Sequence, residues 1–130
     1  MAYLAGMGGG AERAEPRQEL PLRPRDYLVL VALSAGEMHG YALIREIEAL
    51  PGGVRMDPAN LYRALRRLTR EGLVVASEKR PVRADDDERR RYYALTPAGR
   101  RVASAEAERL LELTRIARRR RLLPKPGQGS

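Results

Sequence analysis

The chain has 130 residues, which suits one domain around a single hydrophobic core and is too short for two domains and a linker. It contains no cysteine, which excludes disulfides, thiolate metal clusters and a cysteine nucleophile. The formal net charge of +8 at pH 7 favours a polyanionic partner, and residues 60–130 carry 19 of the 25 basic side chains.

No stretch of the sequence is typical of a membrane or secreted protein. The longest apolar run, residues 27–33, is far shorter than the roughly 20 residues that a membrane-spanning helix needs. The N-terminus has no basic stretch followed by an apolar segment. We therefore expect a cytoplasmic protein without membrane association.

The first half of the chain predicts an arm and two helices. Residues 1–22 mix glycine, proline and charge without a period, and we expect a flexible N-terminal arm. A first helix begins at Pro24, with Asp26 at its positive end, and stops near residues 34–36. Apolar residues at helical spacing predict a second helix from about Gly40 to Leu50.

The clearest start signal belongs to the third helix, with Asp57 as N-cap and Pro58 in the first turn. Helix-forming residues continue to Glu71, before a glycine cap. Two short β-favouring runs, 73–77 and 91–95, then flank the charged segment 78–90 and predict a hairpin with a polar tip. A fourth helix is expected from the N-cap Thr96 to about Leu123.

This order of elements is that of a winged helix-turn-helix. The predicted fold class is mainly α with a small β-hairpin (α+β). We expect the winged-helix domain over residues 23–95, a long C-terminal dimerisation helix over 96–123 and a disordered tail over 124–130.

The third helix has two different faces. Its inner face is predicted to be core and carries Leu61, Ala64, Leu65 and Leu68. The outer face is a row of arginines, which can read guanine edges or clamp phosphates. Near the helix start we expect base contacts from Asn60, Tyr62 and Arg63. Phosphate contacts are expected from Arg66, Arg67 and Arg70. An ordinary solvated helix face is the alternative.

The hairpin strengthens the DNA-binding interpretation. Three arginines on its second strand can lie against the DNA backbone or in the minor groove, namely Arg89, Arg90 and Arg91. The acidic residues 85–88 are interpreted as a solvated turn rather than a metal site. Tyr92 and Tyr93 should point to opposite sides of their strand.

The remaining polar residues do not form a catalytic constellation. His39 is the only histidine, and we expect it to shape the entry to the second helix rather than to bind metal. Tyr41 is predicted to be a packed anchor. The arginines at 118–121 have two open interpretations, a helix-end role and a DNA contact. We expect no enzyme activity and no cofactor.

Five blocks of the sequence together closely resemble the PadR family of bacterial regulators. They are VLVAL at 29–33, MHGY at 38–41, PANLYRALRRL at 58–68, EGL at 71–73 and RRRYYALTPAGR at 89–100. The resemblance covers about residues 24–123. It implies a winged-helix dimer that represses transcription at a pseudo-palindromic operator until an effector releases it. The short C-terminal region resembles the form with a single dimerisation helix.

The resemblance further implies that the first and last helices form the dimer interface, which brings in Leu28 and Val31. The last helix independently carries an apolar stripe that one small domain cannot bury, made of Ala103, Ala107, Leu110, Leu111, Thr114 and Ala117. A small-molecule effector is expected at this interface, although the chain has neither the Trp nor the Phe that would sandwich a flat aromatic ligand. The alternative function is a basic helical interaction protein that binds nucleic acid non-specifically or an acidic protein.

Overall fold

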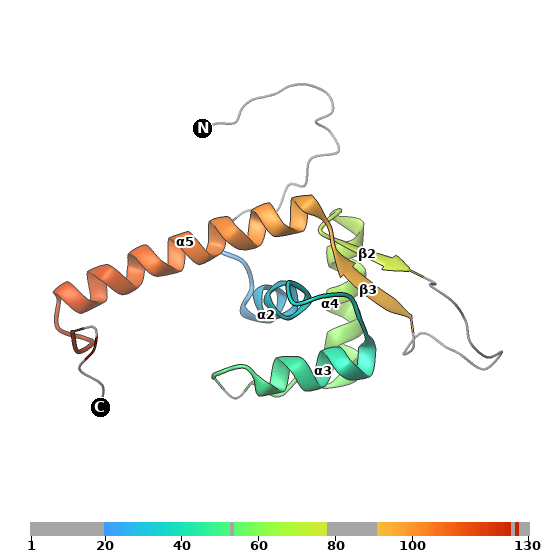
Figure 1. Cartoon of the computed structure of the whole chain (residues 1–130), viewed down its shortest axis with the longest axis horizontal. Helices are drawn as coiled ribbons and strands as arrows, with labels where there is room; N and C mark the ends of the chain where they lie inside the picture. The colour runs from blue at the N-terminus through green and yellow to red at the C-terminus, as the bar shows by residue number, and fades with distance from the viewer. Residues whose placement is uncertain (1–19, 53, 78–90, 126, 128–130) are drawn as a thin grey trace, which may run out of the picture.

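The computed structural model describes residues 20–52, 54–77, 91–125 and 127. This part of the chain forms four helices and a three-stranded sheet (Figure 1). In chain order the elements are α2 (Pro24–Leu33), β1 (Met38–His39), α3 (Gly40–Ala49), α4 (Pro58–Arg70), β2 (Val74–Ser77), β3 (Tyr92–Leu95) and α5 (Pro97–Arg119). The order confirms the predicted α+β winged-helix class.

Each of the three later helices begins with a side-chain cap. His39 caps α3, where its Nδ1 accepts a hydrogen bond from the Ala42 N–H at 3.3 Å. Asp57 and Thr96 cap α4 and α5 in the same way. Because a cap satisfies an amide that the helix leaves unpaired, these residues set where the helices start. The expected role of His39 at the helix entry is confirmed.

The sheet has one more strand than the hairpin that we expected. β3 lies in the middle, antiparallel to β2 on one side and to β1 on the other. With only two residues, β1 is too short to show a period in the sequence. The two tyrosines of β3 differ as predicted: Tyr93 is buried, whereas Tyr92 is half-buried and meets the His39 ring edge-on at 5.7 Å.

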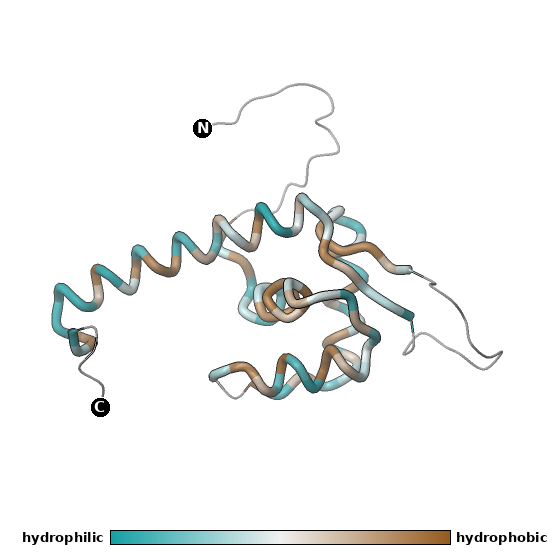
Figure 2. Tube along the Cα trace, in the orientation of Figure 1, coloured by the Kyte–Doolittle hydropathy of each residue, from teal (hydrophilic) through white to brown (hydrophobic). Residues whose placement is uncertain are grey.

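The core lies between α2, α3, the inner face of α4 and the sheet (Figure 2). All four residues predicted for the inner face of α4 are buried, at 1% exposure or less. Leu22 also belongs to the core, although we expected it in the flexible arm. The folded region therefore begins earlier than the sequence pattern indicated. The rest of the predicted arm, residues 1–19, lies outside the described residues.

The start of α5 is held tightly against the end of α4. Thr96 Oγ1 donates to the Gly72 carbonyl at 2.7 Å. A Cβ at Gly99 would collide with the backbone carbonyl of Leu73. α5 then extends beyond the rest of the domain (Figure 1) and ends at Arg119, four residues before the expected Leu123. The end follows from the left-handed backbone of Arg121, with φ 66°, which no glycine signals in the sequence.

Candidate nucleic-acid interface

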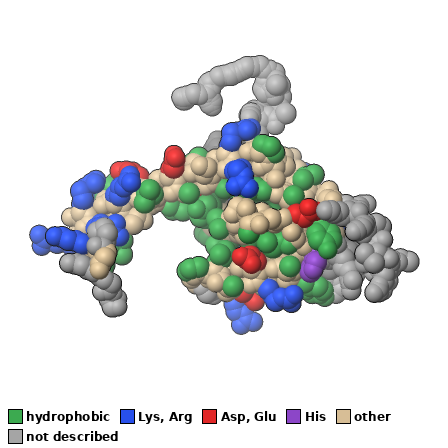
Figure 3. Space-filling view, viewed as in Figure 1, with side chains coloured by type: hydrophobic (Ala, Val, Ile, Leu, Met, Phe, Trp, Pro, Cys, Tyr) green, Lys and Arg blue, Asp and Glu red, His purple; other side chains and the backbone are tan. Residues whose placement is uncertain are grey.

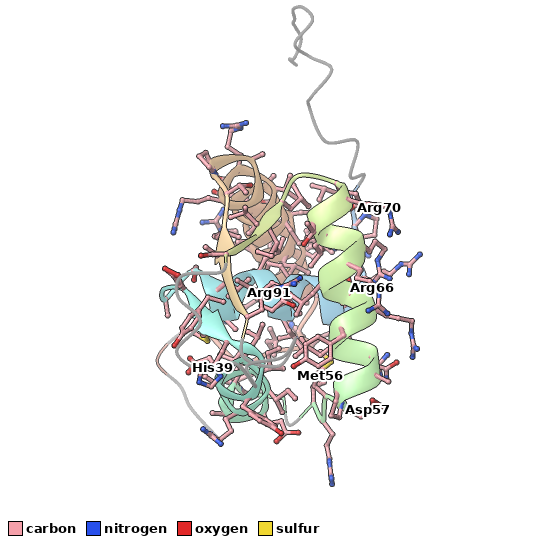
Figure 4. The ribbon with its side chains drawn as sticks, turned by 90° about the vertical axis from the view of Figure 1, so that its right-hand side faces the viewer. His39, Met56, Asp57, Arg66, Arg70 and Arg91 are labelled. Carbon is pink, nitrogen blue, oxygen red and sulfur yellow. The ribbon has the colours of Figure 1, made fainter. Side chains whose placement is uncertain are left out.

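The exposed side of α4 carries its cations opposite the buried leucines. Arg63, Arg66 and Arg70 are all exposed. Figure 4 shows Arg66 and Arg70 projecting from the side of α4 that faces away from the sheet. Because the opposite side of the helix is core, this face is the one that can approach a partner. Its guanidinium groups suit phosphates and guanine edges.

A chain of hydrogen bonds organises the first turn of α4. Asp57 Oδ1 accepts from the Asn60 backbone N–H at 3.1 Å, and Asp57 Oδ2 accepts from Asn60 Nδ2 at 3.1 Å. Asn60 Oδ1 in turn accepts from Arg63 Nη2 at 2.6 Å. A guanidinium has five N–H donors, so Arg63 keeps further donors for a ligand. The N-terminal turn thus presents an ordered amide and an oriented cation.

Arg67 has a different environment from the other arginines of α4. Its Nη2 and Nε donate to Asp26 Oδ1 at 2.6 Å and Oδ2 at 3.3 Å, and the Asp26 side chain is only 1% exposed. These hydrogen bonds raise the pKa of Arg67 above its ordinary value, while burial opposes the shift. The structure gives Arg67 an intramolecular partner, which the helical periodicity of α4 alone could not reveal.

Two other predicted DNA-contact residues, Tyr62 and Arg91, differ in burial and in their place in the fold. Tyr62 is half-buried and packs against the core. Arg91 is exposed and directly precedes β3 (Figure 4). Arg89 and Arg90 lie outside the described residues, as do the acidic residues 85–88. In the described part of the chain, no group of three or more His, Asp or Glu side chains could hold a metal ion.

A hollow between α3 and the start of α4 contains cations that the sequence analysis missed. Its lining includes Tyr41, Asn60 and three exposed arginines, Arg25, Arg45 and Arg55. Tyr41, which we predicted to be a packed anchor, is 43% exposed. The arginines come from three separate segments, so no local pattern predicts that they meet. Two exposed carboxylates, Glu48 and Asp57, line the same hollow, so its charge is mixed, with three cations and two anions.

The far half of α5 carries apolar side chains that the described chain leaves uncovered. Leu111 and Leu113 are 48% and 50% exposed, and Leu122 beyond the helix is 76% exposed. Within the predicted stripe, Ala107 is exposed like Leu111, while Leu110, Thr114 and Ala117 are half-buried. Ala103 packs against the domain's own core.

The other predicted interface residues lie on α2, and the free end of α5 carries cations. On α2, Leu28 and Val31 are half-buried. Figure 3 shows Lys and Arg side chains gathered at the free end of α5. None of the helices in the described ranges is both long and apolar enough to cross a membrane.

Comparison with known proteins agrees with this arrangement. The family model described as "Transcriptional regulator PadR-like family" matches residues 29–105. The "Transcriptional regulator Rv3488" of Mycobacterium tuberculosis is 42% identical over 79 residues, which are 61% of this chain and 68% of that protein. An uncharacterized 37.1 kDa protein in transposon TN4556 of Streptomyces fradiae is 41% identical over 87 residues. The chain covers only 23% of that longer protein, and 67% of this chain is matched.

The fold also resembles that of Bacillus subtilis PadR in complex with operator DNA. The two structures superpose with a TM-score of 0.54 at 24% identity. The similarity covers 64% of this chain and 47% of that one. At this identity the comparison establishes the winged-helix fold.

Proposed function

The chain belongs to the PadR-like family of transcriptional regulators, and we propose that it is a repressor that binds a pseudo-palindromic operator as a homodimer. The observation that carries the proposal is the two-faced helix α4, with buried leucines on one side and exposed Arg63, Arg66 and Arg70 on the other. A recognition helix needs this arrangement to enter the major groove. Because its proposed partner is chromosomal DNA, the proposed place of action is the bacterial cytoplasm.

The contacts divide by position on the surface. Asn60, Tyr62 and Arg63 lie at or near the start of α4 and are proposed to reach base edges. Phosphate contacts are proposed for Arg66, Arg70 and the wing arginines Arg89, Arg90 and Arg91. To these we add the hollow's arginines, namely Arg25, Arg45 and Arg55, which surround the same end of α4. Arg67 is assigned to Asp26 instead of to phosphate, because its side chain is only 26% exposed and its charge is paired with the buried Asp26 carboxylate through two hydrogen bonds.

The proposed dimer buries exposed apolar side chains of α5 against a second copy. Exposed Leu111 and Leu113 are costly for an isolated domain, since apolar surface is stabilised by removal from water. Leu28 and Val31 of α2 are proposed to join this interface. A twofold dimer presents two copies of α4 to half-sites about 10 base pairs, or a multiple of that, apart. An effector bound at the interface is proposed to release the DNA.

Selection from random double-stranded DNA followed by footprinting tests the proposal. The expected result is an inverted repeat that the full chain protects and whose binding survives an excess of unrelated DNA. The alternative is a basic protein that binds polyanions without sequence preference. In that case no repeat is enriched and all binding collapses together as salt rises.

A further inference from the structure

Two buried carboxylates join the helices of this domain to one another. The first is Glu106 of α5, which is 2% exposed. Its Oε2 accepts a hydrogen bond at 3.2 Å from the backbone N–H of Leu22, just ahead of α2. Arg109, one turn along α5, donates from Nε to Oε1 at 2.7 Å and from Nη2 to Oε2 at 2.8 Å. Arg109 thereby orients the carboxylate that holds the start of α2.

The second carboxylate is Asp26, in the first turn of α2 and 1% exposed. It accepts the two hydrogen bonds from Arg67 of α4. Leu22 and Asp26 are therefore close in the chain, and a backbone hydrogen bond from Tyr27 N–H to the Arg23 carbonyl at 3.0 Å stiffens the segment between them. One end of α2 is thus tied to α5 through Glu106 and to α4 through Asp26.

A second pair of contacts defines the direction of α5. Its start is held at Gly72 and Leu73, next to the end of α4, by Thr96 and Gly99. Glu106 makes a further polar attachment, about 10 Å along the helix axis from Gly99 at 1.5 Å per residue. Two separated points determine an axis. Because α5 continues to Arg119, roughly 20 Å beyond Glu106, a small shift at Glu106 becomes a larger one at the free end.

We infer that Glu106 and Asp26 are positioning residues that hold α5, α2 and α4 at one mutual angle, and that in the dimer this angle sets the distance between half-sites. The inference rests on the proposed function. α5 is the proposed contact with the second copy, and α4 is the proposed reader, so their mutual angle determines how far apart the two readers lie. Apolar packing alone is non-directional, whereas the bidentate pair between Asp26 and Arg67 has a fixed geometry. At Glu106 the link to the start of α2 is one directional hydrogen bond from Leu22 N–H, to a carboxylate that Arg109 orients from within α5.

The position of Arg67 explains why the orientation of α4 depends on the contact with Asp26. Arg67 lies at the margin between the buried and the exposed side of α4, with its side chain 26% exposed. Its attachment to Asp26 therefore fixes how α4 is turned about its own axis. A rotation of α4 about its axis would redirect Arg63, Arg66 and Arg70 together with Arg67, since all four arginines share one helix.

The test measures which half-site spacings the dimer accepts. Wild type, Glu106→Gln and the matched control Glu112→Gln are titrated with the selected repeat and with versions whose spacer is shortened or lengthened by a few base pairs. Glu112 is on the same helix but makes an exposed ion pair with Arg115, with both side chains 58% exposed. Both substitutions remove one negative charge from α5.

We expect Glu106→Gln to reduce the preference for the best spacing by roughly threefold to tenfold, with the control unchanged. Binding to a single isolated half-site should be the same in wild type, Glu106→Gln and Glu112→Gln. A general loss of folding would instead weaken this binding as well. Arg109→Lys retains the charge but loses the forked contact, and a smaller reduction is expected. It serves as the second variant if Glu106→Gln fails to fold. Asp26→Asn, tested on the same DNA set, should likewise broaden the accepted spacings.

The outcomes separate this inference from the proposed function. If wild type itself enriches no inverted repeat, the proposed function fails and the inference falls with it. If wild type prefers one spacing and Glu106→Gln and Arg109→Lys keep the same preference as Glu112→Gln, only the inference is overturned. Equal losses of Glu106→Gln on single half-sites and on full repeats would also overturn it, because they would show a defect in DNA binding by each subunit and not in the spacing between the two.

Discussion

Arg67 of α4 holds both carboxylate oxygens of the buried Asp26 on α2, at 2.6 and 3.3 Å. The pair joins the proposed recognition helix to the centre of the domain. The Asp26 side chain is almost fully enclosed, at 1% exposure. The removal of the arginine would leave a buried negative charge without its cation.

Arg67→Ala is therefore expected to lower the free energy of unfolding by about 3 kcal/mol, near the low end for a broken buried pair because Arg67 is itself 26% exposed. Urea unfolding of both proteins measures the change. Arg70→Ala, an exposed substitution on the same helix, should stay within about 0.5 kcal/mol of wild type. Similar values for the two variants would contradict the structural role of Arg67.

Arg63 and Arg70 are expected to affect DNA binding in different ways. Arg63, oriented by Asn60, is the proposed base reader, so Arg63→Ala should cost about 1–3 kcal/mol on the operator and relax selectivity at one position. Arg70→Ala should weaken binding to all DNA sequences alike. It should also make the slope of log binding constant against log salt concentration shallower by about one. Titrations against operator and mutated operators at several salt concentrations measure both effects. Identical profiles for the two variants would refute this division.

The proposed dimer depends on the uncovered apolar side chains of α5. Leu113 is 50% exposed in the single chain, and Leu113→Glu places a charge at the proposed interface. We expect the variant to be folded but monomeric at micromolar concentration in sedimentation experiments. Glu112→Gln, its immediate neighbour, should remain dimeric. A dimeric Leu113→Glu would show that another surface joins the two copies.

Helical periodicity was sufficient to predict the buried side of α4, since Leu61, Ala64, Leu65 and Leu68 repeat at regular spacing. Caps such as Asp57 and Thr96 marked helix starts for the same local reason. Long-range partners could not be predicted in this way. Nothing near Asp26 in the sequence indicates that Arg67 lies against it, because 41 residues separate them and only tertiary packing brings them together.

In the candidate site, too, features set by nearby residues could be predicted from the sequence, whereas features set by tertiary packing could not. The exposed arginines of α4 follow from its periodicity, whereas the hollow that adds Arg25, Arg45 and Arg55 depends on how three segments pack. The two-residue strand β1 was missed because strand recognition needs several alternating positions. On α5, the exposure of Leu113 could not be predicted, since apolar residues lie on several sides of this helix.

Gly99 is expected to tolerate no larger side chain. The Cβ of Gly99→Ala would overlap the Leu73 carbonyl and come within 2.9 Å of the Leu95 side chain. Because the carbonyl is backbone and also accepts from Thr96 N–H at 3.1 Å, it has little room to move. We expect a loss of about 1–3 kcal/mol in thermal or urea unfolding. Ser104→Ala, at an exposed position of α5, is the control, and an equally small effect of both would argue against the close contact.

Acid should weaken the domain partly through Glu106. Hydrogen bonds from Arg109, and secondarily from the Leu22 N–H, hold the pKa of Glu106 below its ordinary value, although burial opposes the shift. The unfolded chain therefore binds a proton at a higher pH than the folded one does. The stabilisation is fully present above the unfolded pKa, about 4.3 for glutamate, and is lost as the pH falls through the lower folded value. The free energy of unfolding, measured with urea from neutral pH into this acid range, should fall less steeply for Glu106→Gln than for wild type. Parallel curves would mean that Glu106 titrates alike in the folded and unfolded chains, contrary to the buried contact with Arg109.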